Sequence, residues 1–298
     1  MEKTPILASP AAPATSTSSH VGRLAAAATV LGLVVLVQHK GTAPATALSL
    51  RTTSLGTEAF WMPVAAPAEV KFHQISAGHG RVCATATTGR VYCAAEDDLS
   101  AWTPLVGSTQ HIELTDSMLF RAATDDSLSY AHASAPTAWS AMYGSNKQLS
   151  ANGNFVCGID HQAVAYCLDL ANPIAWAVMW ANNSDKGTVK QLLLHGDAYF
   201  AVNNMDQVYV GKPSAGMVGD EPQATEVAGL FTQLTSNGAT LCGVNRQAEI
   251  FCADSGLDST PNWAHVAHVP GDATAVHAST THLYAINARG ALFAHLWN

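Results

Sequence analysis

The chain has 298 residues, of which only 12% are charged, and its net charge is −8 at pH 7. An acidic chain without clusters of lysine and arginine is poorly suited to bind nucleic acid, so we expect no nucleic-acid partner. After residue 40 we find no amphipathic helix, and Pro and Gly interrupt short apolar runs, which indicates an all-β domain long enough to bury a core.

The beginning of the chain differs from the rest in composition. Residues 1–23 are rich in Ser, Thr, Ala and Pro, so we expect them to be disordered. Residues 24–40 contain an uncharged, mostly apolar run, Leu24–Val37. A signal-peptide hydrophobic region has about 7 to 15 residues and a membrane-spanning helix about 20, so the length of this run favours a signal peptide. Residues 41–57 would then be a linker.

Two outcomes for this hydrophobic segment stay open, beside a third in which it is a buried helix of the folded domain. A small-residue site at Ala45–Ala47 would release a mature chain that begins near Leu48, whereas an uncleaved segment would be a single-pass type II membrane anchor. Cleavage or anchoring places the domain in the secretory pathway, either secreted and extracellular or at the cell surface or endomembranes. In that setting Asn182, in the only Asn-x-Ser/Thr sequon we find, is a glycosylation candidate.

The most regular feature of the chain is a repeat marked by cysteines. Three pairs have nine residues between their members: Cys83 with Cys93, Cys157 with Cys167, and Cys242 with Cys252. Three cysteine-free copies of the same segment follow in alternation: FRAATDDSLSYA (120–131), YFAVNNMDQVYV (199–210) and LYAINARGALFA (283–294). Aligned in this way, Arg121 takes the place of the first cysteine in copy two. The copies recur about every 40 residues, which is the size of a propeller blade.

Each copy predicts a hairpin, because two β-prone runs flank a polar turn. A first strand precedes the hairpin, with an aliphatic residue that usually follows Gln, as in Gln74-Ile75, or less clearly in Glu113-Leu114. A fourth strand carries Trp followed three residues later by an aliphatic residue, although copy four has Ala224 instead; these residues are Trp102, Trp139, Trp176 and Trp263. Six copies of four short antiparallel strands predict a six-bladed β-propeller.

The ring also needs a closing strand, because copy six ends without a tryptophan strand of its own. Trp61–Val64 matches the missing motif and lies before the first copy. We therefore predict that an N-terminal strand completes the last blade, and that residues 58–298 form one propeller domain.

The cysteine pairs are expected to be disulfides, because the secretory pathway is oxidising. With a turn centred on residue 88, positions 83 and 93 face each other on adjacent strands, within reach of a disulfide. The alternative is that these cysteines pack as small apolar residues between the blades. A zinc site is not expected, because zinc ligands prefer shorter cysteine spacing.

With these motifs in place, the run LCGVNRQAEIFCADSGLDSTPNWAHV (241–266) resembles a tectonin repeat, in which a Gly-Val-Asn turn and a Trp-x-x-Val strand recur in a six-bladed propeller. The resemblance extends over 58–298 and is weakest in copies two and four. It implies a lectin or surface-recognition protein that binds glycans without catalysing a reaction. A second resemblance, to repeats of the chromosome-condensation-regulator type, implies a scaffold for protein partners.

Candidate ligand-binding residues are of two kinds, because sugars need a flat aromatic face and a few carboxamide or carboxylate groups. Trp180 lies outside the repeat register in a polar stretch, and four polar residues occupy hairpin turns: Asp160, Asn203, Asn245 and Asn287. Asn and Asp also favour turns for backbone reasons alone. The repeated tryptophans have a structural alternative as well, as packing wedges between blades.

Catalytic chemistry has no clear signal in the chain. It contains no Gly-x-Ser-x-Gly elbow, phosphate loop or dinucleotide fingerprint, and its histidines form no HExxH motif. We therefore expect no enzymatic activity, no cofactor and no metal. The expected partners are glycans or a surface glycoprotein, bound by a monomer.

Overall fold

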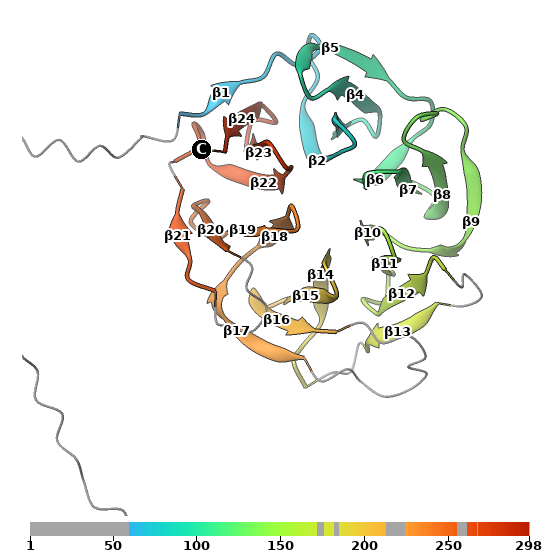
Figure 1. Ribbon diagram of the computed structural model, residues 1–298, viewed down its shortest axis with the longest axis vertical. Coiled ribbons are helices and arrows are strands. Elements are labelled where there is room, and N and C mark those ends of the chain that lie inside the picture. Colours follow the sequence, from blue (N-terminus) through green and yellow to red (C-terminus); the bar gives the residue numbers. More distant parts are fainter. Residues whose placement is uncertain are drawn as a thin grey trace, which may run out of the picture. The chain divides into compact units, whose positions relative to one another are not determined.

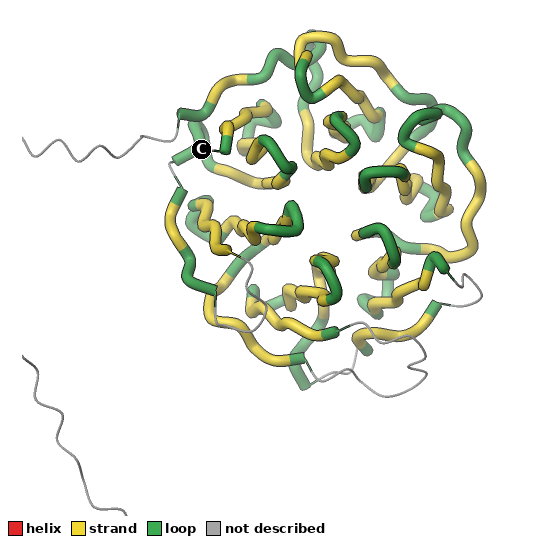
Figure 2. Tube along the Cα trace, in the orientation of Figure 1, coloured by secondary structure: helices red, strands yellow, loops and turns green. Residues whose placement is uncertain are grey.

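The structure is a computed structural model that describes residues 60–171, 176–181, 185–212, 224–254, 261–266 and 268–297. These residues form six separate four-stranded antiparallel sheets arranged around a central axis (Figures 1 and 2). The predicted six-bladed β-propeller is confirmed. The predictions for residues 1–23, 24–40 and 41–57 and for Asn182 lie outside the described residues. Within the described ranges no helix is long and apolar enough to cross a membrane.

Blades one to three follow the chain from inside to outside. Blade one consists of β2 (Phe72–Gly78), β3 (Arg81–Ala86), β4 (Val91–Ala95) and β5 (Asp98–Pro104). Blade two consists of β6 (Thr109–Leu114), β7 (Met118–Ala123), β8 (Ser127–His132) and β9 (Ser140–Ser145). Blade three consists of β10 (Gln148–Ala151), β11 (Phe155–Ile159), β12 (Ala165–Asp169) and β13 (Ala177–Trp180).

Blades four to six complete the ring. Blade four consists of β14 (Val189–His195), β15 (Ala198–Asn203), β16 (Gln207–Gly211) and β17 (Thr225–Leu230). Blade five consists of β18 (Gln233–Ser236), β19 (Thr240–Val244), β20 (Ile250–Asp254) and β21 (Ala264–His265). Blade six consists of β22 (Ala273–Ala278), β23 (His282–Asn287), β24 (Leu292–Leu296) and, from the other end of the domain, β1 (Met62–Pro63).

The strand β1 closes the ring as predicted. Met62 pairs with Ala294 and Pro63 with Phe293, and the amide of Val64 donates to the carbonyl of Leu292 at 2.9 Å. Figure 1 shows β1, at the start of the described chain, lying outside β24 in the blade that ends it. The outermost strand of the last blade therefore ties the two ends of the domain together.

The three cysteine pairs form disulfides, as predicted. In blades one, three and five the bonded partners are Cys83 and Cys93, Cys157 and Cys167, and Cys242 and Cys252, respectively. The two cysteines of each pair are direct partners on the second and third strands, with Cα atoms 4.0 to 4.1 Å apart. Each bridge therefore fixes the pairing register of one hairpin. Three disulfides are consistent with a secreted or extracellular protein.

The alternative prediction was that the cysteines are unpaired and pack between blades. They are paired, so the first half of this alternative is wrong. None of the six cysteines is free. The bridges nevertheless contribute to the packing between blades. Cys167 is buried in the hydrophobic cluster shared by blades three and four, and Cys252 is partly buried against the cluster shared by blades five and six.

The alignment of copy two was wrong by one residue. Phe120 pairs with Tyr130 as Cys83 pairs with Cys93, so Phe120 and not Arg121 is at the cysteine position. A shift of one residue moves a strand side chain to the other face of the sheet. Phe120 is buried at 1% exposure, whereas Arg121 points its guanidinium to the neighbouring Trp139 ring, 4.4 Å from the ring centroid.

Candidate functional site

The central channel is lined by the first strand of each blade, and glutamines hold these strands to one another. The side-chain amide of Gln74 donates to the Ile112 carbonyl at 2.7 Å, and the amide of Ile112 donates back to the Gln74 oxygen. Gln148, Gln191 and Gln233 clamp the same position of the next blade in the same way. The side-chain amides of these glutamines therefore hydrogen-bond to the backbone of the next blade.

A second set of clamps divides the ring into pairs of blades. The hydroxyls of Ser76, Ser150 and Thr235, in blades one, three and five, each accept a backbone N–H of the following blade at 2.9 Å. The same three blades carry the disulfides. This alternation supports the idea that a two-blade unit was repeated three times.

Blades two and six carry titratable side chains at these two positions. His111 of β6 occupies the glutamine position, and Glu113 of β6 and His277 of β22 occupy the hydroxyl position. The sequence alignment had put Glu113-Leu114 at the glutamine position, which is wrong by two residues. Three titratable side chains thus enter the channel at positions where most other blades carry Gln, Ser or Thr.

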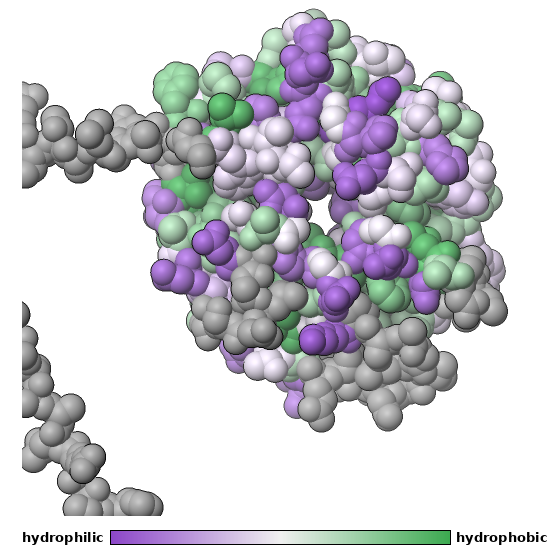
Figure 3. Space-filling view, in the orientation of Figure 1, coloured by the Kyte–Doolittle hydropathy of each residue, from purple (hydrophilic) through white to green (hydrophobic). Residues whose placement is uncertain are grey.

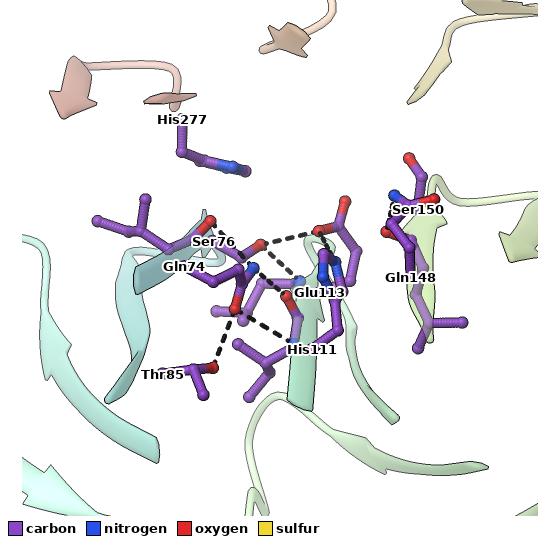
Figure 4. A network of polar contacts seen from close by, with 12 residues as sticks. Gln74, Ser76, Thr85, His111, Glu113, Gln148, Ser150 and His277 are labelled. Carbon is purple, nitrogen blue, oxygen red and sulfur yellow. Dashed lines mark hydrogen bonds and ion pairs between the residues drawn. The ribbon is translucent and has the colours of Figure 1, made fainter. Parts of the chain in front are cut away.

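These three side chains line one cavity inside the ring. The Nε2 atom of His111 is buried, has no hydrogen-bond partner among the described residues, and lies 3.9 Å from Oε2 of Glu113. The Ser76 hydroxyl donates to the same Glu113 oxygen at 3.3 Å. Figure 4 shows the His277 imidazole entering the same space from blade six. A cavity of about 100 Å³ is lined by all three residues.

Burial governs the charge of this cluster. Desolvation raises the pKa of Glu113 to about 8 and lowers the pKa of both His111 and His277 to about 4. At neutral pH all three side chains are therefore uncharged.

One end of the channel opens into a wider mouth. This mouth has a volume of about 340 Å³ and shares Ala77, Leu114 and Ser236 with the inner cavity. Among the described residues its lining includes the carboxylates of Glu96 and Asp116 and no lysine or arginine. Hydrophilic residues gather around the central opening on the face seen in Figure 3.

A second pocket lies on the face of the propeller that carries the hairpin turns. It has a volume of about 530 Å³ and is formed by the turn of blade one, the segment before β2 and the segment before β6. Its lining combines the Tyr92 side chain with polar groups from Glu69, Lys71, Thr88 and Arg90. Glu69 has a φ of 64°, a conformation that is uncommon outside glycine and often marks a functional turn.

A third depression, between blades two and three, is mainly apolar. It has a volume of about 520 Å³ and is lined by Met118, Met142, Leu170, Trp176 and Tyr143. Tyr143 is 91% exposed.

The polar turn residues predicted to bind ligand have a backbone role. Each begins its hairpin turn, and its Oδ1 atom accepts the amides two and four residues ahead; these residues are Asp160, Asn203, Asn245 and Asn287. Asn203 and Asn287 are buried. The turn chemistry of Asn and Asp explains all four.

Trp180, which the sequence placed in a polar stretch outside the repeat register, is the last residue of strand β13 and lies in the core. Its side chain is 2% exposed, its indole N–H donates to the Gly187 carbonyl at 2.9 Å, and its ring packs 5.3 Å from that of Tyr209. It belongs to the same hydrophobic cluster that Ala224 contacts. Trp180 of blade three thus fills the space that the absent tryptophan of blade four would occupy, and it cannot stack on a ligand.

The repeated tryptophans are packing residues between blades. The indole N–H groups of Trp102, Trp176 and Trp263 donate to carbonyls of the preceding blade at 2.7 to 2.8 Å. Phe72 and Phe231 pack against Trp102 and Trp263, respectively. In the described residues no group of three His, Cys, Asp or Glu side chains gathers to hold a metal ion.

A comparison of the sequence with protein-family profiles identifies the family of this chain. The profile of the Tectonin domain matches residues 71–237, just over half of the 298 residues. The chain belongs to the tectonin family. The matched part of this tectonin runs from the start of blade one to the end of the first strand of blade five, and the remaining blades repeat the same strand pattern. A search of curated proteins finds no match.

Solved structures resemble the tectonin propeller in fold only. YCF48 from Cyanidioschyzon merolae has a TM-score of 0.53 at 10% identity, covering 76% of this chain and 83% of that one. Human WBSCR16 has a TM-score of 0.52 at 10% identity, covering 78% of this chain and 75% of that one. The Cps50 (Swd1) β-propeller domain of Myceliophteria thermophila has a TM-score of 0.52 at 8% identity, covering 76% of this chain and 83% of that one. At these identities the similarity establishes the propeller and nothing about its ligand.

Proposed function

We propose that this tectonin propeller is a non-enzymatic binding protein that recognises glycans, and that the turn-face pocket beside Tyr92 is its glycan site. The observation that carries this proposal is the combination of groups in one open pocket. Tyr92 offers an aromatic ring, and Glu69, Arg90 and Thr88 offer a carboxylate, a guanidinium and a hydroxyl. Sugars bind through stacking on an aromatic face and through several hydrogen bonds from such groups.

The packing of the tryptophans supports this choice of site by elimination. Trp102 and Trp263 each pack against a phenylalanine ring and donate their N–H to a neighbouring blade, and Trp180 is buried. Tyr92 also contacts the Phe72 ring, edge-on at 6.2 Å, but it is in the lining of the open turn-face pocket, where a sugar can reach it. The glycan would be carried by a surface glycoprotein or be free in solution.

The proposal also covers the cellular location of the protein. Three disulfides fit an oxidising compartment. We propose that the protein is secreted or held by a single-pass type II anchor as a monomer, and that Asn182 carries a glycan.

A glycan array probed with the purified protein tests the proposal. Arg90→Ala removes an exposed side chain of the turn, and Tyr92→Leu removes the aromatic face. Tyr166→Leu is the matched control, because Tyr166 occupies the same register in blade three. We expect binding of a defined glycan class, at least tenfold weaker in the two pocket variants and unchanged in the control. Absence of binding to any glycan, or equal loss in the control, would contradict the proposal.

The second candidate function is a scaffold for protein partners, as in propellers of the chromosome-condensation-regulator type. The apolar depression between blades two and three favours it, because Met118, Met142 and Leu170 offer an apolar, adaptable surface beside the exposed Tyr143 ring. The fitting partner is an extended polypeptide that inserts an aliphatic or aromatic side chain. A protein partner lost on Tyr143→Ser and Met142→Ser, in a protein that binds no glycan, would favour this function.

A further inference from the structure

We propose that the central channel holds a second binding site, specific for a primary ammonium group and formed by His111, Glu113 and His277. This site lies inside the ring of first strands, whereas the proposed glycan pocket is formed by the hairpin turn of blade one and the segments before β2 and β6. The two proposals therefore stand or fall separately.

The two imidazoles are oriented as hydrogen-bond acceptors. Nε2 of His277 lies 3.2 Å from the Ala77 carbonyl of the next blade, so this nitrogen carries the proton and donates it. His111 likewise donates to the backbone of Leu149 in the next blade. Because Nε2 of His111 has no partner, the proton lies on the other ring nitrogen. Each neutral ring is left with a lone pair on the nitrogen that its backbone contact does not use.

Glu113 supplies the third acceptor. Its carboxyl group receives the Ser76 hydroxyl at 3.3 Å and a backbone N–H from Ala151. Its Oε2 atom lies 3.9 Å from the bare nitrogen of His111, too far for a direct hydrogen bond. An ammonium group has three N–H donors and no acceptor, so it complements a site made of two imidazole lone pairs and a carboxylate.

The path to this site is selective for cations. Glu96 and Asp116 are in the lining of the mouth, and no described lysine or arginine lines the mouth or the inner cavity. The other titratable groups near the cluster are histidines: His79 and His195 line the mouth, and His73 interacts electrostatically with His111. Carboxylates in a narrow space without compensating cations raise the local concentration of positively charged ligands.

The size and spacing of the groups favour ammonium over a metal ion. The cavity of about 100 Å³ admits the end of an alkylamine and little more. A transition metal would need several ligand atoms near 2 Å, and no three metal-ligating side chains of the described residues gather closely enough. An ammonium group reaches its acceptors through N–H bonds at about 2.7 to 2.9 Å, which suits a wider site.

Binding should release one proton. Burial keeps the Glu113 carboxyl protonated at neutral pH, and only the carboxylate can pair with an ammonium ion. The proton leaves the carboxyl group for the solvent, and the carboxylate then accepts an N–H of the ligand. The apparent affinity should therefore rise about tenfold from pH 6 to pH 7 and level off above about pH 8.

Calorimetric titration of the full chain with methylammonium, in two buffers of different ionisation enthalpy, tests this site. We expect saturable binding with about one proton released at pH 7, and much weaker binding of K⁺, which has a similar size but no N–H donors. Equal binding of K⁺ or of tetramethylammonium would overturn the proposal. Binding of Zn²⁺ without binding of methylammonium, or absence of binding by all of these ions, would also overturn it.

Two variants that imitate other blades keep the fold and remove the site. His111→Gln installs the glutamine found at this position in four blades, and Glu113→Ser installs the serine of blades one and three. We expect each to weaken methylammonium binding at least tenfold, and Glu113→Ser to abolish proton release. Glu226→Ser, which removes an exposed carboxylate from β17, is the control and should bind normally. Unchanged binding in Glu113→Ser would refute the assignment.

Discussion

The hydroxyl of Tyr284 in blade six donates a hydrogen bond to the carboxylate of Glu96 in blade one at 3.2 Å, across 188 positions of the sequence. The hydroxyls of Ser279 and Thr281 donate to the same carboxylate oxygen. This contact lies at the seam where the last blade meets the first. Glu96 therefore adds a polar contact between blades six and one to the closure that β1 makes within blade six.

Replacing Glu96 should weaken the contact between blades six and one. In Glu96→Gln the three hydroxyls lose a charged acceptor, and hydrogen bonds to charged groups contribute about 1.5 to 3 kcal/mol. We expect the free energy of unfolding to fall by about 2 kcal/mol in urea denaturation. Asp97→Asn is the control, since Asp97 is exposed next to Glu96, and it should unfold like the wild type. A Glu96→Gln protein as stable as Asp97→Asn would show that the seam contributes nothing.

The contribution of Glu96 should also depend on pH. Burial raises the pKa of Glu96, but the hydroxyls of Ser279, Thr281 and Tyr284, with His282, outweigh it and hold the pKa below the ordinary value of 4.5. A lowered pKa in the folded state gives stability that is present above 4.5 and lost as the pH falls through the folded value. The stability difference between wild type and Glu96→Gln should persist at pH 7 and shrink below pH 4. A difference that grows with acidity would contradict this sign.

The glutamine clamps make a separate prediction about cohesion between blades. Gln191 binds both the N–H and the carbonyl of Leu234, at 2.7 and 2.8 Å. Gln191→Ala leaves both backbone groups without these partners, which should cost about 1 to 3 kcal/mol of unfolding free energy. Gln162→Ala, in an exposed turn, should be neutral. Thermal unfolding of the two variants side by side checks the difference.

The sequence was sufficient for the architecture because every blade repeats the same alternation of strand and turn. The number of copies followed from their spacing, the ring closure from the Trp61–Val64 motif, and the cysteine partners from their position in the hairpin. The ligand residues did not, because a turn Asn and a binding Asn look alike in one sequence. The register of copy two was missed because Phe120 and Arg121 are adjacent, and only strand pairing separates their faces. The cluster of His111, Glu113 and His277 was missed because His277 comes from blade six, and because the sequence alignment placed β6 of blade two out of register by two residues.

The hairpin turns hold a further testable feature. The residue after the centre of each turn has positive φ, and it is Gly in blades one and six but Ala163 and Ala248 in blades three and five, at 59° and 60°. Glycine adopts this conformation without the strain that alanine meets. Ala163→Gly should therefore raise the unfolding free energy by about 0.5 to 1 kcal/mol. Ala95→Gly, in the strand β4, should lower it by a similar amount. Destabilisation by Ala163→Gly would disprove strain at this turn.

A double-mutant cycle can test whether Trp180 fills the space that a tryptophan at position 224 would occupy between blades three and four. Trp180→Ala should cost about 3 to 5 kcal/mol, because it removes a fully buried ring that contacts Tyr209. Ala224→Trp in the wild-type protein should also destabilise, because Trp180 already fills the space beside Ala224. In the double variant the tryptophan at 224 would enter the cavity left at 180 and recover part of the loss. Denaturant unfolding of the four proteins gives the coupling energy, and additive losses would show that the two positions do not share one space.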